Sequence, residues 1–169
     1  MRLPRSGRHA LPDAVRRAPV AAGEKVLAGV VDEDGAVAVG TRDALYVAGH
    51  RVPWETVERA DWSRDDGTLT VVEVGTWGEQ RPVHTIAVDQ PGLFLQLVRE
   101  RVTASVVLQR HVPVNGRKGV FVIARRPPRG DQPISWVYEF EAGVDPDDPD
   151  VRRVAEEALA RARDEVGLA

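Results

Sequence analysis

The sequence contains no cysteine, so disulfide bonds, thiolate metal sites and a cysteine nucleophile are all excluded. It also has no apolar run near the length of about 18 residues that a membrane-spanning helix needs. Lysine is nearly missing: among 23 basic residues only Lys25 and Lys118 are lysines. The content of 43% hydrophobic and 29% charged residues is too apolar for a disordered chain and predicts a globular one.

Catalytic motifs are missing from the sequence as well. It has no HExxH, no serine in a GxSxG setting and no Gly-rich phosphate-binding loop. The histidines are not spaced as zinc ligands; they are His9, His50, His84 and His111. We therefore expect a protein that is not an enzyme, with no cofactor and no metal. The alternative is an unfamiliar active site that combines His84 or His111 with Glu139 or Glu141.

The N-terminal residues 1–21 are basic and rich in proline, and they lack the apolar segment of a secretory signal. We interpret them as a flexible arm of a cytoplasmic protein.

Charge is unevenly distributed, although the net charge is only −3. Residues 109–130 carry six basic residues and no acidic one, between two acidic regions. One interpretation is that these strands pair with the acidic C-terminal helix. The other is an anion-binding face for a phosphate ligand or nucleic acid. Its candidate binding residues are Arg110, His111, Arg117, Lys118, Arg125, Arg126 and Arg129.

Residues 22–107 read as an antiparallel β unit. Short apolar runs recur about every 8–12 residues between turn signals such as Asp65-Asp66-Gly67. This spacing of strands and turns is typical of an antiparallel sandwich or barrel. No strand is expected over 48–53, because Pro53 cannot donate to a ladder. The six predicted strands are 26–31, 36–40, 44–48, 54–62, 69–74 and 83–88.

A helix is predicted to cap this unit. Asp89 is the expected N-cap, and the helix should end near residue 105, before the β-branched pair Val106-Val107. Four apolar side chains fall on one stripe of it and should face the core; they are Phe94, Leu97, Val98 and Val102. In the loop between the last two strands, Trp77 is either a binding anchor or a plug over the end of the β unit.

The segment Val52–Val57, VPWETV, followed by a strand and the Asp65-Asp66-Gly67 turn, resembles the motif of bacterial pleckstrin-homology-like (PH-like) domains. The resemblance covers roughly residues 22–107. It implies an antiparallel β-sandwich or barrel capped by one helix, used as an interaction or assembly scaffold. Family members that bind phosphoinositides have a basic first hairpin loop, whereas residues 32–35 here are acidic and repel phosphate. We therefore expect a protein partner, or a second copy of the chain, rather than a phosphoinositide.

Residues 108–169 are predicted to form a smaller β-β-β-α appendage. The strands are 108–114, 119–126 and 134–141, and Asn115-Gly116 supplies the first turn. Asp148 or Asp150 should cap the final helix, with Pro149 in its first turn. The whole chain is thus an α+β protein.

Overall fold

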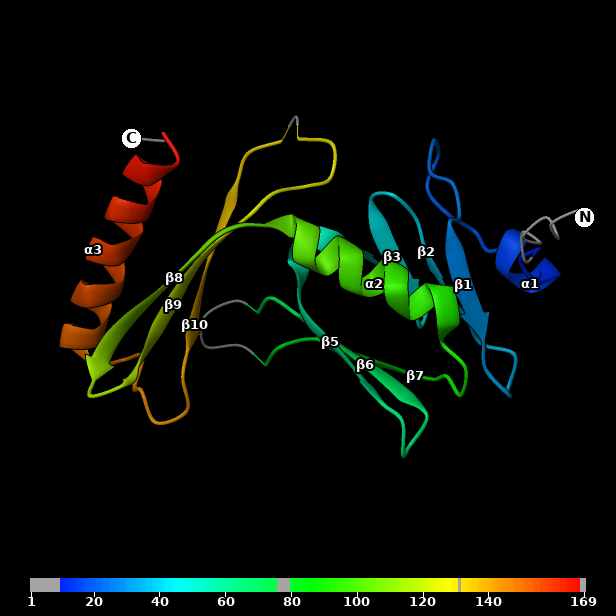
Figure 1. The fold of residues 1–169 in the computed structure, drawn as a ribbon, viewed down its shortest axis with the longest axis horizontal. Coiled ribbons are helices and arrows are strands. Elements are labelled where there is room, and N and C mark those ends of the chain that lie inside the picture. Colours follow the sequence, from blue (N-terminus) through cyan, green and yellow to red (C-terminus); the bar gives the residue numbers. More distant parts are fainter. Residues whose placement is uncertain (1–9, 76–79, 131, 168–169) are drawn as a thin grey trace, which may run out of the picture.

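The computed structural model describes residues 10–75, 80–130 and 132–167, which fold into three antiparallel sheets and three α-helices (Figure 1). The expected mixed α+β class, with antiparallel sheets and a C-terminal helix, is confirmed. One correction concerns closure: within the described residues the strands form three separate open sheets and not a closed barrel. None of the described helices combines the length and apolar character that crossing a bilayer requires.

The first sheet contains β1 (Ala28–Val31), β2 (Val37–Gly40), β3 (Ala44–Val47) and β4 (His50–Pro53), in that order. The strand β4 corrects the sequence analysis, which expected none over 48–53. It pairs with β3 through the two-residue turn Ala48-Gly49, where φ is +50° and +77°. Pro53 lies at the end of this edge strand, where a missing N–H is tolerated.

Part of the predicted flexible arm is a short helix, α1 (Asp13–Arg16). Its Val15 is fully buried. A Cβ built at Gly29 on β1 would lie only 2.7 Å from a methyl carbon of Val15, so the glycine makes room for this contact. Residues 1–9 lie outside the described part of the chain.

The second sheet has the order β5 (Val57–Ser63), β6 (Thr68–Glu73) and β7 (Val83–Ala87). The predicted strand 54–62 starts later than expected, because Trp54–Thr56 form a 3-10 turn, η1. Trp54 is fully buried there and donates from Nε1 to the Thr41 carbonyl at 3.1 Å. The register of β5 shifts between Val57 and Arg59, which is a β-bulge or a similar irregularity.

The helix α2 (Gly92–Ser105) packs against both of these sheets. Asp89 is not its cap: the helix begins at Gly92, and the Phe94 N–H donates to the Pro91 carbonyl. The predicted end at residue 105 is confirmed. Phe94, Leu97 and Val98 are buried as expected, Val102 is partly buried, and Leu95 joins them. The two sheets and α2 therefore enclose one common core.

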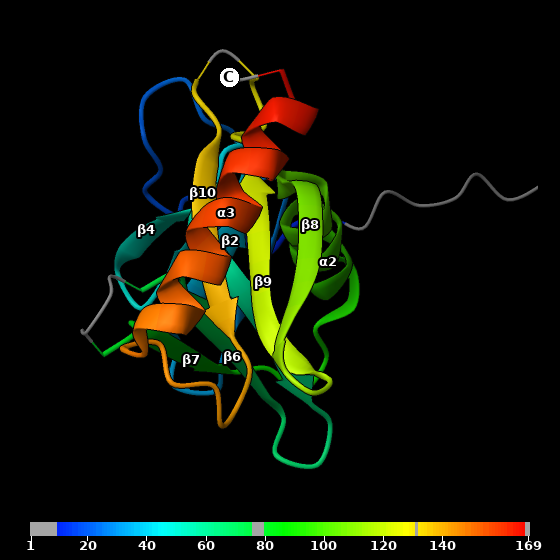
Figure 2. The same cartoon turned by 90° about the vertical axis from the view of Figure 1, so that its left-hand side faces the viewer.

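The third sheet has the order β10 (Ser135–Phe140), β9 (Lys118–Arg125) and β8 (Val106–Asn115), and α3 (Pro149–Glu165) follows. The predicted β-β-β-α order is confirmed, and β8 begins directly after α2. Asp148 is the N-cap of α3, since its carboxylate accepts from the Asp150 N–H at 2.8 Å. Figure 2 shows α3 lying across one face of this sheet, where it packs on β8 and β9.

A hydrogen-bond network around Glu24 ties the segment before β1 to the first sheet. The Glu24 carboxylate, whose side chain is 5% exposed, accepts from Thr41 Oγ1 at 2.6 Å, from Tyr46 at 3.1 Å and from both Nε and Nη2 of Arg51. Burial alone would raise the pKa of Glu24, but these hydrogen bonds outweigh it and lower the pKa.

We expect Glu24→Gln to reduce the loss of stability on acidification. Because the folded-state pKa of Glu24 is lowered, its ionised form stabilises the fold above the unfolded-chain pKa of about 4.3, and this contribution disappears as pH falls through the folded-state pKa. Urea unfolding at about pH 7 and about pH 3 measures the difference. The exposed Glu33→Gln in the β1–β2 turn is the control. Equal pH dependence in wild type and Glu24→Gln would contradict the assignment.

Candidate interaction groove along strand β10

The strand β10 forms an edge of the third sheet, and only its inner side is paired among the described residues. The Glu141 N–H donates to the Gly119 carbonyl at 3.1 Å and continues the ladder by one residue. Backbone groups alternate in an antiparallel pair, so the odd-numbered residues of β10 face β9. The N–H and C=O groups of Trp136 and Tyr138 therefore point outward from the sheet.

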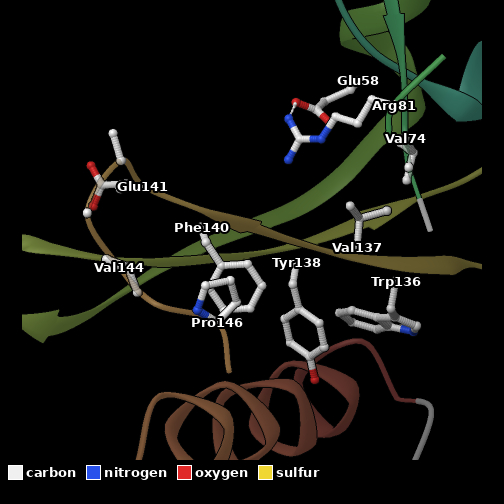
Figure 3. Close-up of a pocket in the computed structure, with 13 residues that line it drawn as sticks. Glu58, Val74, Arg81, Trp136, Val137, Tyr138, Phe140, Glu141, Val144 and Pro146 are labelled. Atoms are coloured by element: carbon white, nitrogen blue, oxygen red, sulfur yellow. Dashed lines mark hydrogen bonds and ion pairs between the residues drawn. The ribbon is translucent and has the colours of Figure 1, made fainter. Parts of the chain in front are cut away.

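A groove of about 520 Å³ runs along this outer edge (Figure 3). Glu58 on β5, Val74 and Arg81 lie on one side of it, and the segment 144–146 before α3 lies on the other. Figure 3 shows Val137 directed toward the side of Arg81 and Val74. The groove thus brings together β5, the segments that flank residues 76–79, and the last strand.

Aromatic side chains give the groove an apolar side. Trp136 and Tyr138 point from β10 toward α3 in Figure 3. They are only partly buried, because α3 is centred over β8 and β9 rather than over β10. Phe140 shares their face and also lines the groove. A bound apolar side chain would find these aromatic rings as its first contact.

Charged side chains of both signs lie around the groove. Arg81 forms an ion pair with Glu58 at 2.6 Å, and burial raises the pKa of Glu58. Glu141 Oε2 lies 2.8 Å from His111 Nε2 and accepts from the Gly119 N–H at 2.6 Å, and these hydrogen bonds lower the pKa of Glu141. The two carboxylates are thus balanced by the Arg81 guanidinium and by the Lys118 ammonium, which donates to the carbonyl of the lining residue Ala142 at 2.8 Å.

The structure disperses the basic residues of 109–130 instead of gathering them on one face. Arg110 pairs with Glu165 on α3, as pairing with the C-terminal helix predicts. Arg129 pairs not with that helix but with Asp43, in the turn between β2 and β3, at 2.8 Å. Lys118 donates to the Ala142 carbonyl at 2.8 Å.

The remaining candidate residues occupy different surroundings. Arg117 is exposed in the β8–β9 turn, and Arg126 is exposed directly after β9. Trp77 lies outside the described residues. Of the combinations in the alternative active site, the structure brings His111 and Glu141 together at 2.8 Å, whereas His84 Nε2 contacts Glu73 at 2.6 Å.

Arg125 is the exception among these arginines, since it is only 3% exposed. It donates from Nη1 to Ser105 Oγ at 3.0 Å and from Nη2 to the Glu58 carbonyl at 3.1 Å, and burial lowers its pKa. The side chain thereby connects β9 with the end of α2 and with β5. A signal was present in the sequence: β9 is apolar on both faces, which is typical of a strand covered on both sides.

Sequence reasoning did not identify Glu58, Val74 or Arg81 as site residues. Nothing local marks them, because they become neighbours of β10 only through the packing of distant segments. Among the described residues no cluster of three or more acidic or histidine side chains could hold a metal ion. Comparison of the chain with protein-family models, curated proteins and solved structures found no match.

Proposed function

We propose that this chain is a non-catalytic interaction module that binds an extended segment of a protein partner along the outer edge of β10. In this proposal residues 22–107 form a PH-like domain, and the β-β-β-α unit supplies the docking edge. The main support for this proposal is that the N–H and C=O groups of Trp136 and Tyr138 face outward into a groove with side chains on both sides. An added strand would continue the ladder and bond to those backbone groups.

The PH-like assignment is supported by the order of the elements. A four-stranded sheet, a three-stranded sheet and then a helix follow one another, with VPWETV at the junction of the two sheets. Trp54 of this motif fills the common core, which gives the motif a structural role. A hollow of about 620 Å³ beside the acidic β1–β2 turn is lined by Asp32, Glu33, Asp66 and Asp89, and these carboxylates disfavour a phosphoinositide there.

The shape of the groove favours a single segment of chain over a second folded copy. Glu58 and Arg81 rise on one side and Val144 and Pro146 on the other, so the strand edge lies recessed between them. A peptide in extended conformation is narrow enough to enter such a groove. The aromatic side of the groove favours a segment with an apolar residue at every second position.

Nucleic-acid binding through residues 110–129 receives less support. Arg110 and Arg129 are engaged with carboxylates, and Arg125 is buried. A polyanion needs several free cations along one track.

Two variants at one position test the proposed strand addition. Tyr138→Pro removes the outward N–H while the ladder to β9 stays intact, because that N–H does not face β9. Tyr138→Ala removes the same ring and keeps the N–H. Peptides are first selected from a random display library for binding to the wild-type chain. They should bind Tyr138→Pro at least about tenfold more weakly than Tyr138→Ala, because the proline variant loses one main-chain hydrogen bond to the peptide and weakens the adjacent ones.

Peptide binding should also change the amide NMR signals of Trp136 and Tyr138. Selected peptides that bind Tyr138→Pro and Tyr138→Ala equally well would contradict the proposal. So would a library that yields no sequence with preference for the wild type over Tyr138→Pro. A concentration-dependent dimer lost only in Tyr138→Pro would assign the edge to a second copy of the chain instead.

A further inference from the structure

A second site lies where the end of α2 meets the segment that follows β9. A hollow of about 340 Å³ is lined there by Arg101 and Ser105 of α2 and by Arg126, Pro127 and Pro128. Its position makes it independent of strand addition at β10. No described carboxylate lines it.

The two arginines of this hollow lack ion-pair partners among the described residues. Arg126 is exposed, so water can solvate it. Arg101 is only partly exposed, and its Nε is buried with no hydrogen-bond partner. A buried charged donor without an acceptor is more destabilising than a neutral one. The fold therefore keeps a guanidinium with one buried, unsatisfied donor beside an open hollow.

The guanidinium of Arg125, which contacts the lining residue Ser105, adds to the positive potential of the hollow. Arg125 donates to Ser105 Oγ at 3.0 Å, and its Nε is also buried without a partner. Carbonyl groups at the end of a helix would normally repel an anion. Two of them are already engaged: the Val102 carbonyl accepts from Ser105 Oγ, and the Thr103 carbonyl accepts from the Val106 N–H.

We propose that this hollow binds a phosphate group, held between the guanidinium groups of Arg101 and Arg126. Guanidinium groups match phosphate oxygens with paired, charge-assisted hydrogen bonds. The volume is at the lower end of small-molecule sites, and Pro127 and Pro128 offer an apolar wall to a short organic substituent. The ligand is therefore a small phosphate monoester, free in solution or carried as a lipid headgroup.

Binding of glycerol 3-phosphate to the full chain, measured by isothermal titration calorimetry, tests this proposal. The wild type should bind saturably below about 10 mM, and both Arg101→Gln and Arg126→Gln should weaken binding at least about tenfold. Arg99→Gln is the matched control, because Arg99 is an exposed arginine on the same helix. Its affinity should stay within about twofold of the wild type.

An NMR signal separates binding from a merely structural role of Arg101. The Nε–H resonance of Arg101 should shift on addition of glycerol 3-phosphate, and Arg126→Gln, at an exposed position, should reduce that shift without changing the fold. Equal binding by wild type and Arg126→Gln, or a wild-type chain that does not bind, would overturn the proposal.

Vesicles distinguish the two sources of the phosphate. Recruitment to phosphatidylcholine vesicles that contain phosphatidic acid, lost in Arg126→Gln, assigns the site to a lipid headgroup. Binding of glycerol 3-phosphate without recruitment assigns it to a free metabolite. Neither result bears on the proposed peptide binding at β10. The two sites are separate, so Tyr138→Pro should bind glycerol 3-phosphate with the affinity of the wild type.

Discussion

Phe94→Ala should lower the free energy of unfolding by about 3–5 kcal/mol. The Phe94 ring is 1% exposed and belongs to the core that both N-terminal sheets share with α2. Removing it takes apolar surface out of the core and leaves a cavity, and the surrounding strands can close that cavity only in part. Urea unfolding followed by tryptophan fluorescence measures the change, since Trp54 lies in the same core.

The neighbouring residue provides a matched control for this variant. Leu93 lies on the same helix and is 67% exposed, so Leu93→Ala should change stability by no more than about 0.5 kcal/mol. If Phe94→Ala lowered the free energy of unfolding by less than about 1 kcal/mol, the buried face of α2 would be wrongly assigned. The assignment of α2 as the helix that caps the β unit would then be wrong as well.

Arg125→Ala should lower the free energy of unfolding by at least about 3 kcal/mol. The substitution removes two hydrogen bonds from a charged donor, each worth about 1.5–3 kcal/mol, and leaves a cavity between the β9 strand and the N-terminal sheets. It also withdraws a cation from the surroundings of Glu58. Unfolding should become less cooperative, because this side chain links the third sheet to both α2 and β5.

Arg126→Ala is the control for that variant, since Arg126 is the next residue along the chain and is exposed. Its effect should stay within about 0.5 kcal/mol. Arg125→Ala unfolding in a single transition at wild-type stability would show that the two parts of the chain are held together without this guanidinium.

Local patterns predicted most of the elements correctly. Short apolar runs on either side of the Asp65-Asp66-Gly67 turn located β5 and β6, and Pro149 after Asp148 located the start of α3. The errors occurred where local chemistry allows two outcomes. Pro53 reads as a strand breaker, but at the end of an edge strand it does no harm. Asp89 reads as a helix cap, but the chain turns into α2 only at Pro91.

The charged residues show why the candidate sites were harder to predict. Six cations within 109–130 suggest one basic face, yet a strand directs successive side chains to opposite faces of its sheet. Arg110 faces α3 and finds Glu165, whereas Arg125 faces the N-terminal sheets and is buried. No sequence pattern marks Arg101, because an arginine on a helix is ordinarily solvated.

The sequence by itself determined the α+β class, the order of most strands and helices, and the apolar side chains that form the core. Periodicity carries that information, since it depends only on residues close in the chain. Only the tertiary structure decided which strand lies at the edge of the third sheet, which arginine is buried and which arginines line the hollow at the end of α2. Those properties depend on contacts between residues as distant as Glu58 and Arg125, and no local pattern encodes such a pairing.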